Sequence, residues 1–382
     1  MSYIVDVRRK LHQYPEIGFD LPRTLKLVKT ELDKMGINYT EKFGKSSVVA
    51  TLNEEKSNFT IGIRADMDAL PIEEKTNLPF KSKIKGQMHA CGHDAHTAIL
   101  LDTARRLSEI KEKINCQVKF IFQPAEEYPP SGAMLMCKDS LMDDIDCVIA
   151  LHVDCKYNSG TIGLSVGPQN ATSNGFLIEF FGKSAHVAGQ ELGIDAITMV
   201  VKAYTAIEFM IAKEFSNRDV RIFNVGAING GHSNNVICDY ASMFCTLRTW
   251  DNEIDSAIIK RIKSIIKAVA KESGGKSKFT QKKYYPFVDN NEKITNLIRQ
   301  SAIKVIGAEN IVPKQRSMGG EDFSYMANEK PGCMFHLGIK NEEKGCIYSA
   351  HQDKFTVDED VLTIGSDIFV QFVLDNMDGV KD

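Results

Sequence analysis

At 382 residues the chain is longer than most single hydrophobic cores, so two domains are expected. Hydrophobic residues make up 43% and charged residues 25%, with a formal net charge of −3, which argues against a disordered chain and against a nucleic-acid partner. No apolar run approaches the roughly 20 residues that span a bilayer, and the first residues lack the pattern of a signal peptide, so we expect a cytoplasmic protein without a membrane partner.

The N-terminal part of the chain begins with helical spacing and then alternates between strands and helices. Apolar residues from Tyr3 to about Met35 indicate two helices, broken near Pro15 and Pro22, and Gly36 marks the end of the second. A further helix is predicted from His96 to Lys113. Four apolar strands are predicted: Ser47 to Leu52, Phe59 to Arg64, Val118 to Phe122 and Val148 to Leu151. This alternation favours a sheet with helices on both faces.

A different pattern begins near Asn174 and ends near Tyr284. The elements expected in it are a strand, a helix, two strands and a second helix: Phe176 to Phe181, Asp195 to Phe215, Val220 to Ile228, Tyr240 to Arg248 and Glu253 to about Lys271. Gly274-Gly275 then gives a good stop signal for the second helix. These elements make a compact α+β unit.

The α/β pattern returns after Tyr284. We expect a helix from Asn290 to Ile306, a strand from Met334 to Leu337 and a closing helix from Glu359 to Asn376. The predicted fold class is therefore α/β, with residues 1–173 and 284–382 forming one discontinuous domain. Residues 174–283 form a smaller α+β domain inserted into it.

Polar clusters follow several of the predicted strands. Asp66 and Asp68 follow the second strand, the pair Glu126-Glu127 follows the third, and His152 follows the fourth. Ligands of open α/β sheets gather at the carboxyl ends of strands. These side chains are therefore expected to converge on one crevice.

The densest cluster runs from Met88 to His96 and holds three of the nine histidines and one cysteine. Thiolate, imidazole and carboxylate are the ligands that zinc and its divalent neighbours prefer, and Cys91-Gly92-His93 lets two of them reach one site. The alternative is a helix N-terminus with polar capping residues and a buried thiol. The other cysteines include four inside apolar runs, and we expect most of the nine to be reduced core residues.

Four more residues complete a candidate metal site. One of the carboxylates in Glu126-Glu127 could hold a metal while the other takes a proton from water, although such a pair is more often a solvated surface. His152 and His351, each taken alone, would more often be ordinary core or surface histidines. Together with Cys91 and His93 they supply about the number of ligands that two divalent ions need.

Three long motifs resemble one family: RADMDALP at Arg64 to Pro71, MHACGHDAH at Met88 to His96 and FQPAEE at Phe122 to Glu127. The family is the dinuclear metallo-amidohydrolases that include hippurate hydrolase, auxin-conjugate hydrolase and N-acetyl-diaminopimelate deacetylase. Further matches cover nearly the whole chain: HQYPEIGF at His12 to Phe19, GKSAHVA at Gly182 to Ala188, NNVICD at Asn234 to Asp239, LRT at Leu247 to Thr249 and GGEDFSY at Gly319 to Tyr325.

The resemblance implies a catalytic α/β domain of the zinc-peptidase type with an inserted lid domain that commonly serves for dimerisation, so a homodimer is expected. It implies that the metal ligands are Cys91, His93, Glu127, His152 and His351. Glu126 resembles the general base, Asp68 a carboxylate that orients a ligand, and His186 a lid histidine that projects toward the substrate, often across the dimer interface. Asp66 is only a weak metal candidate, because relatives in the wider superfamily carry a histidine there.

The function implied is metal-dependent hydrolysis of the amide bond of an N-acyl, in the first instance N-acetyl, amino acid. Two divalent ions, Zn²⁺ or Mn²⁺ with Co²⁺ or Ni²⁺ as alternatives, would activate water, and Glu126 would take its proton. Arg248 and Asn234 could bind the substrate carboxylate, although Arg248 could equally pair with a structural aspartate. The alternatives are a dipeptidase or aminopeptidase of the same superfamily, or a catalytically silent metal-binding scaffold. The departures at Val187 to Gln190 and Tyr128 to Pro130 leave the preferred acyl group open.

Overall fold

A computed structural model describes residues 2–56, 58–216 and 221–379 of the chain. The chain divides into two compact units. Unit 1 consists of Met1–Gln169, Val288–Arg316 and Asp322–Asp382, and unit 2 of Asn170–Phe287 and Ser317–Glu321. The second unit thus takes one long insertion and a five-residue segment that lies far along the chain.

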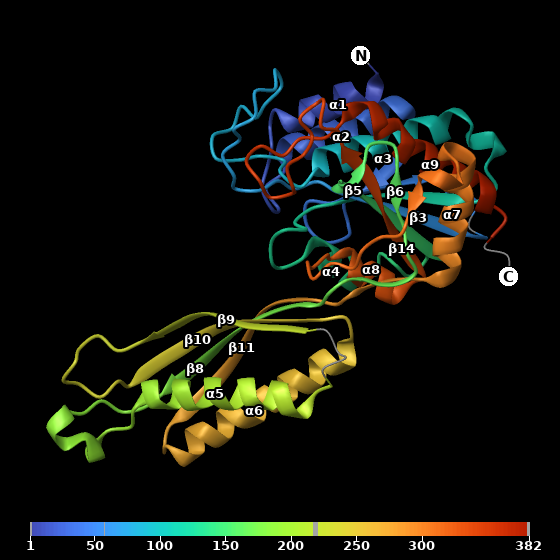
Figure 1. Ribbon diagram of the computed structural model, residues 1–382. Helices are drawn as coiled ribbons and strands as arrows, with labels where there is room; N and C mark the ends of the chain where they lie inside the picture. The colour runs from blue at the N-terminus through green and yellow to red at the C-terminus, as the bar shows by residue number, and fades with distance from the viewer. Residues whose placement is uncertain (1, 57, 217–220, 380–382) are drawn as a thin grey trace. The chain divides into compact units, whose positions relative to one another are not determined.

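Unit 1 is built on an eight-stranded mixed sheet with the order β1-β2-β4-β3-β5-β14-β6-β13 (Figure 1). Its central strands β4, β3, β5 and β14 run parallel to one another. Strand β2 pairs antiparallel with β4, and β6 pairs antiparallel with β14 and parallel with β13. The strands are β1 Asn38–Thr40, β2 Val48–Leu52, β3 Thr60–Asp66, β4 Gln117–Gln123, β5 Cys147–Asn158, β6 Ile162–Gly163, β13 Ile311–Val312 and β14 Gly332–Lys340. A separate two-stranded sheet joins β7 Gly167–Asn170 to β12 Val288–Asn290.

Helices cover both faces of this sheet, because the central strands carry apolar side chains on both of their faces. Val148 and Ala150 face a core shared with α4 and α8, whereas Ile149 and Leu151 face the larger core formed with the other helices. The helices are α1 Tyr3–His12, α2 Pro22–Met35, α3 His93–Glu109, α4 Gly132–Lys138, α7 Glu292–Ile306, α8 Phe323–Glu329 and α9 Leu362–Asn376. Three short 3₁₀ turns complete this unit: Lys111–Lys113, Ala308–Asn310 and Glu359–Val361. The α/β prediction is confirmed.

Unit 2 is a four-stranded antiparallel sheet with the order β11-β8-β10-β9, covered on one face by two helices that lie side by side (Figure 1). Its elements are β8 Ser173–Phe181, the 3₁₀ turn Val187–Leu192, α5 Ala196–Glu214, β9 Arg221–Gly230, β10 Tyr240–Thr249, α6 Asn252–Glu272 and β11 Lys276–Tyr285. The carboxylates of Asp195 and Asp251 accept hydrogen bonds from the first backbone N–H groups of α5 and α6, so both helices begin where a capping residue stands. Val220, the first residue of one predicted strand, lies outside the described residues.

Helices α4 and α8 and the short strands β1, β6, β7, β12 and β13 were not predicted. Three further element predictions need correction. The strand β11 was not expected, because lysine and other polar residues fill most of its positions and leave no apolar run. The strand β5 continues to Asn158, so His152 lies within the strand and not after its end. Helix α3 begins at His93 and not at His96, which places His93 and His96 in its first turn.

Unit 1 and unit 2 hold nine cysteines, and all of them are free thiols, eight of them buried. Burial raises the pKa of several of these thiols, for example that of Cys147 to about 12 and that of Cys116 to about 11. Within the described residues, no helix is both long and apolar enough to cross a membrane. The cytoplasmic location expected from the sequence stays a prediction.

Candidate metal centre

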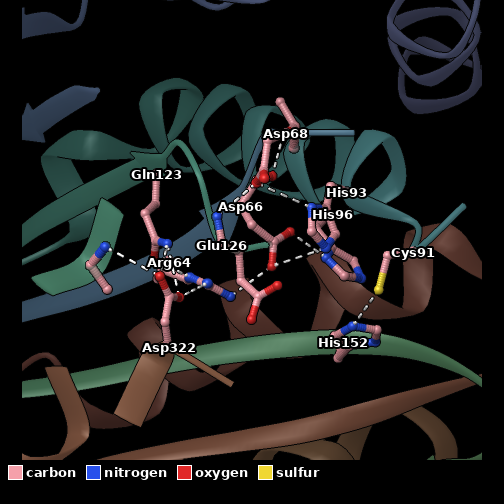
Figure 2. Close-up of polar contacts among 12 residues, drawn as sticks. Arg64, Asp66, Asp68, Cys91, His93, His96, Gln123, Glu126, His152 and Asp322 are labelled. Atoms are coloured by element: carbon pink, nitrogen blue, oxygen red, sulfur yellow. Dashed lines mark hydrogen bonds and ion pairs between the residues drawn. The ribbon is translucent and has the colours of Figure 1, made fainter. Parts of the chain in front are cut away.

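The segment Cys91–His93 is held against strand β5 by a glycine. Gly92 has a φ of 90°, and a Cβ atom on it would lie 2.3 Å from Cγ2 of Val153. Only glycine therefore allows this close approach. As a result, the thiol of Cys91 comes within 3.4 Å of Nε2 of His152 (Figure 2).

The tautomer of His152 follows from its backbone contact. Nδ1 lies 2.7 Å from the carbonyl oxygen of Val153. Because a carbonyl only accepts hydrogen bonds, Nδ1 carries the hydrogen, and in the neutral ring Nε2 keeps its lone pair. That lone pair is on the nitrogen near Cys91, which is the arrangement found in metal-ligating histidines.

The loop after β4 carries the two glutamates and is anchored by Asp68. The carboxylate of Asp68 accepts hydrogen bonds from the backbone N–H groups of Glu126, at 2.9 Å, and of Glu127, at 3.2 Å. Ala125 adopts a positive φ of 50° immediately before them. Gly132 closes the loop, because a Cβ there would lie 1.8 Å from the carbonyl oxygen of Pro124. Asp68 therefore orients both glutamates through their backbone.

His351 reaches the same place from the C-terminal part of the chain. Its backbone N–H donates to the carbonyl of Ala90 at 2.8 Å, and its Nε2 lies 2.9 Å from Oε1 of Glu127. Its side chain is 53% exposed. Despite its burial, the carboxyl of Glu127 has a lowered pKa, because His351 and His93 favour its charged form.

His93 is the most revealing donor of the cluster. It is buried, and neither ring nitrogen makes a hydrogen bond to a described residue. Carboxylate oxygens of Asp68 and Asp66 lie 3.5 Å from Nδ1 and 3.7 Å from Nε2. Burial lowers the pKa of His93, but the charges of Asp66, Asp68 and Glu127 outweigh it and raise the pKa to about 10. The surroundings of this ring thus favour a positive charge.

The five ligands implied by the resemblance share overlapping clusters. Ligand atoms lie within 4.8 Å of one another in the groups Cys91/His93/His152, Cys91/Glu127/His351 and His93/Glu126/Glu127. Thiolate, imidazole and carboxylate suit zinc and its divalent neighbours. His93 is a buried imidazole whose ring nitrogens make no hydrogen bond to a described residue, the lone pair of His152 Nε2 faces the thiol of Cys91, and carboxylates lie close by. These residues therefore fit a pair of divalent ions.

Asp66 is bound by its neighbours within this site. Its Oδ2 accepts from Nη1 of Arg64 at 2.7 Å, and its Oδ1 lies 2.6 Å from Nδ1 of His96 (Figure 2). Nε2 of His96 accepts the backbone N–H of Val153 at 2.9 Å, so Nδ1 is the donor to Asp66. Burial lowers the pKa of His96 to about 4, which keeps this ring neutral. Asp66 and His96 thus hydrogen-bond to each other and to the strands next to the cluster.

A buried ionic network that the sequence reasoning missed lies beside the glutamate loop. The Arg64 guanidinium donates to Asp322 at 2.8 Å and to Oε1 of Gln123 at 2.8 Å (Figure 2). Asp322 also accepts from Ser131 Oγ at 2.6 Å and from the Gln123 amide. The only signal was the presence of Arg64 and Asp322 in two of the motifs. The network ties β3, β4 and α8 together below the site.

The three substrate residues predicted in the inserted region all lie in unit 2. His186 is exposed, and its Nδ1 accepts the backbone N–H of Ala188 at 3.1 Å. Asn234 is exposed in a turn. Arg248 is half-buried and donates to the carbonyl of Met318 at 3.1 Å, and no carboxylate among the described residues forms an ion pair with it. Burial lowers the pKa of Arg248.

Comparison with known proteins shows which proteins this chain is similar to. The sequence profile of peptidase family M20/M25/M40 matches residues 62–375. Thermostable carboxypeptidase 1 of Saccharolobus solfataricus is 37% identical over 370 residues, which are 96% of this chain and 93% of that protein. N-acetyl-L-cysteine deacetylase of Bacillus subtilis is 35% identical over 356 residues, which are 93% of this chain and 84% of that protein. The solved structure of the Bacillus subtilis YXEP protein, described as a dinuclear metal binding peptidase of the M20 family, matches with a TM-score of 0.84 at 30% identity and covers 98% of this chain and 97% of its own.

Proposed function

The chain belongs to peptidase family M20/M25/M40, and from this premise we propose that it hydrolyses the amide bond of an N-acyl amino acid, with N-acetyl amino acids as the first candidates. The products are a carboxylic acid and a free amino acid. Membership establishes the coarser activity, that of a metal-dependent amidohydrolase or peptidase. The N-acyl specificity is the proposal, and the relative named as an N-acetyl-L-cysteine deacetylase supports it.

The observation that carries the proposal is the convergence of five donor side chains, one of which is the buried imidazole of His93, whose ring nitrogens make no hydrogen bond to a described residue. We assign two divalent ions, Zn²⁺ or Mn²⁺ in the first place, to Cys91, His93, Glu127, His152 and His351. When bound, the ions supply Lewis acidity and lower the pKa of a coordinated water. The soft thiolate favours zinc, while the mixed nitrogen and oxygen donors also admit Mn²⁺, Co²⁺ and Ni²⁺.

Glu126 is the general base in this proposal. It is 7% exposed, and its backbone is fixed by Asp68, so its carboxylate has little freedom to leave the cluster. It takes a proton from the attacking water and gives it to the leaving nitrogen. Asp68 acts through the backbone of the two glutamates and does not need to touch the substrate.

We assign residues 1–173 and 284–382 to the catalytic domain and residues 174–283 to a lid domain. His186 would stabilise the negative charge that develops on the carbonyl oxygen, and its exposed position leaves it available for that purpose. Arg248 and Asn234 would bind the substrate carboxylate. The half-buried guanidinium of Arg248 contacts a carbonyl and no described carboxylate, which suits a residue that receives an anion from the substrate.

The surface of unit 2 supports a homodimer. Helix α5 exposes an apolar row, in which Val201 is 55% and Phe209 is 65% exposed. The helix packs against β10 and β9, and β9 is the last strand of its sheet, with one backbone edge that pairs with no described strand. The other helix, α6, instead exposes Lys260, Lys263, Lys267 and Lys271. The apolar flank of α5 and β9 is therefore the surface that we assign to a second copy of this chain.

A carboxypeptidase is the second candidate, favoured by the 37% identical relative named as a carboxypeptidase. Both activities cleave an amide next to a free carboxylate and differ in what lies on the acyl side. The dipeptidase or aminopeptidase alternative differs more, because its substrates carry a free amine there. Arg248 would serve the first two activities equally.

The decisive test compares an N-acetyl amino acid, its C-terminal amide and a dipeptide, with acetate and free amino acid measured separately. We expect acetate from the N-acetyl amino acid, and a fall in kcat/KM of about 10- to 100-fold for the amide, because Arg248 would lose its anion. The variant Arg248→Met should show no preference between acid and amide. Equal rates for acid and amide with the unmodified enzyme would contradict carboxylate recognition, and faster cleavage of the dipeptide would favour the peptidase alternatives.

A further inference from the structure

A second histidine stands directly beside the candidate metal centre. His336 interrupts the apolar run of strand β14, between Phe335 and Leu337. It is 8% exposed, and in the parallel pairing of β14 with β5 it is the registered partner of His152. Residues in register on neighbouring strands point to the same face of the sheet, so this pairing places the two imidazoles side by side.

The two rings are stacked. Their centroids are 5.7 Å apart, and their planes differ by 21°. On His152 a second ring contact comes from His96, whose centroid lies 4.7 Å away at an interplanar angle of 64°. A third buried ring, that of His93, has its centroid 6.3 Å away at an angle of 88°, so the ring of His152 has three imidazole neighbours.

Asp154 fixes the ring of His336. Oδ2 of Asp154 lies 3.1 Å from Nδ1 of His336, and Oδ1 accepts the backbone N–H of Lys156 at 2.9 Å. Asp154 lies on the same strand as His152, two residues further on, and hence on the same face. Nε2 of His336 is buried and has no hydrogen-bond partner among the described residues. The only polar anchor of this ring that the structure describes is thus Asp154.

We propose that His336, held by Asp154, is a positioning residue that fixes the plane of the His152 imidazole and thereby strengthens the binding of the metal ion that His152 holds. The proposal rests on the metal role assigned to His152 under the proposed function. The hydrogen bond from His152 Nδ1 to Val153 fixes one end of the ring, and the stacked ring of His336 restricts its rotation about that bond. A ligand that is already oriented loses less freedom when the ion binds, so its affinity is higher.

The experiment is a calorimetric titration of Zn²⁺ into metal-free enzyme, which resolves two binding events. In His336→Ala the event that depends on His152 should weaken by about 10-fold or more, as is usual when an outer partner of a ligating histidine is lost, while the other event should remain. His336→Phe keeps a flat ring in the stack and gives up only the contact with Asp154, so it should restore most of the affinity. Wild-type affinity in His336→Ala, or equal weakness in the Phe and Ala variants, would overturn the proposal.

Three further variants make the result specific. Met334→Ala removes a buried side chain from the same strand and the same face, so it should lower the stability without changing either Zn²⁺ affinity, and a matching loss of affinity would reduce the effect to general destabilisation. Asp154→Ala serves if His336→Ala does not fold. It leaves the polar ring of His336 without its anchor, whereas the apolar ring of phenylalanine packs in the stack without one, so Asp154→Ala should weaken the same binding event. His152→Ala distinguishes the positioning role of His336 from the metal role of His152. If it weakens Zn²⁺ binding and His336→Ala does not, only the positioning role fails, whereas full binding in His152→Ala overturns the metal assignment itself.

Discussion

His93 in unit 1 and His186 in unit 2 are both predicted active-site histidines, yet their surroundings are opposite. His93 is 1% exposed, has carboxylates near both ring nitrogens and makes no hydrogen bond to a described residue. His186 is exposed and uses Nδ1 to accept a backbone N–H two residues away. The first ring is enclosed and lies between two carboxylates. The second ring is exposed, so its predicted role depends on a substrate or a second subunit that covers it.

Buried aspartates of the two units show the same contrast. In unit 1 the Asp94 carboxylate lies 2.7 Å from Nδ1 of His12 and accepts from Nε of Arg8 at 3.1 Å. Burial raises its pKa, but these two cations outweigh burial and leave the pKa well below its usual value. In unit 2 Asp255 accepts hydrogen bonds only from neutral groups, Thr172 and Asn174, and burial raises its pKa. The buried carboxylate of Asp94 is thus stabilised by charge, and that of Asp255 is held by neutral hydrogen bonds.

The largest expected effect comes from separating the two glutamates of unit 1. Glu126→Gln should keep both metal ions and lower kcat by about 100- to 10,000-fold with little change in KM, because a general base acts in the transition state. Glu127→Gln should instead lose metal. Metal content and steady-state kinetics of the two variants decide this. Metal depletion in Glu126→Gln would reverse the two roles.

The next prediction asks whether unit 2 acts on the partner subunit. If His186 reaches the site of the other subunit, mixing inactive His186→Ala with inactive Glu126→Gln should recover activity, because half of the mixed dimers' sites combine two intact residues. With random exchange about a quarter of the wild-type activity is expected. The matched control mixes Glu126→Gln with Glu127→Gln, which both damage unit 1 and should recover nothing. No recovery in dimers whose exchange is verified by mass would place His186 in its own subunit.

Much of unit 1 could be predicted from the sequence because its signals are local. The apolar runs indicated the central strands, and three of the proposed metal ligands, Cys91, His93 and Glu127, stand in short motifs whose resemblance to a family is confirmed by the profile match. The start of α3 was misplaced, because the left-handed backbone of Gly92 and its contact with Val153 are tertiary facts. The contact of Arg64 with Asp322 joins residues 258 positions apart, and no local pattern encodes such a pair.

Unit 2 shows where that reasoning fails. Strand β11 carries lysine at four of its ten positions and pairs on one side only, with β8. Lysine is typical of edge strands because it discourages pairing with other chains, and the same residues erase the apolar alternation by which strands are recognised. His336 escaped notice for a related reason. A single histidine in an apolar strand has no meaning until the register places it opposite His152.

The smallest expected effect tests the contrast between the two aspartates. Because the pKa of Asp255 is raised in the folded protein, the unfolded chain loses this proton first as the pH rises, and the folded state is destabilised as the pH passes from the unfolded value of about 3.9 through the raised one. Asp255→Asn removes this dependence and keeps at least one of the two hydrogen bonds. Relative to the unmodified protein, the variant should therefore gain stability as the pH rises from 3.5 to 7. Trp250, the single tryptophan of the chain, lies in unit 2, so its fluorescence during urea unfolding reports on this unit.

Asp94→Asn is the opposite case in unit 1 and is followed by circular dichroism. Its lowered pKa means that the carboxylate stabilises the folded state above the unfolded value and that this contribution is lost as the pH falls, so the asparagine variant should lose stability on going from pH 3.5 to 7 relative to the unmodified protein. The two difference curves should therefore have opposite slopes. Parallel slopes would mean that Asp255 is stabilised by charge as Asp94 is, and the distinction between these two buried aspartates would be lost.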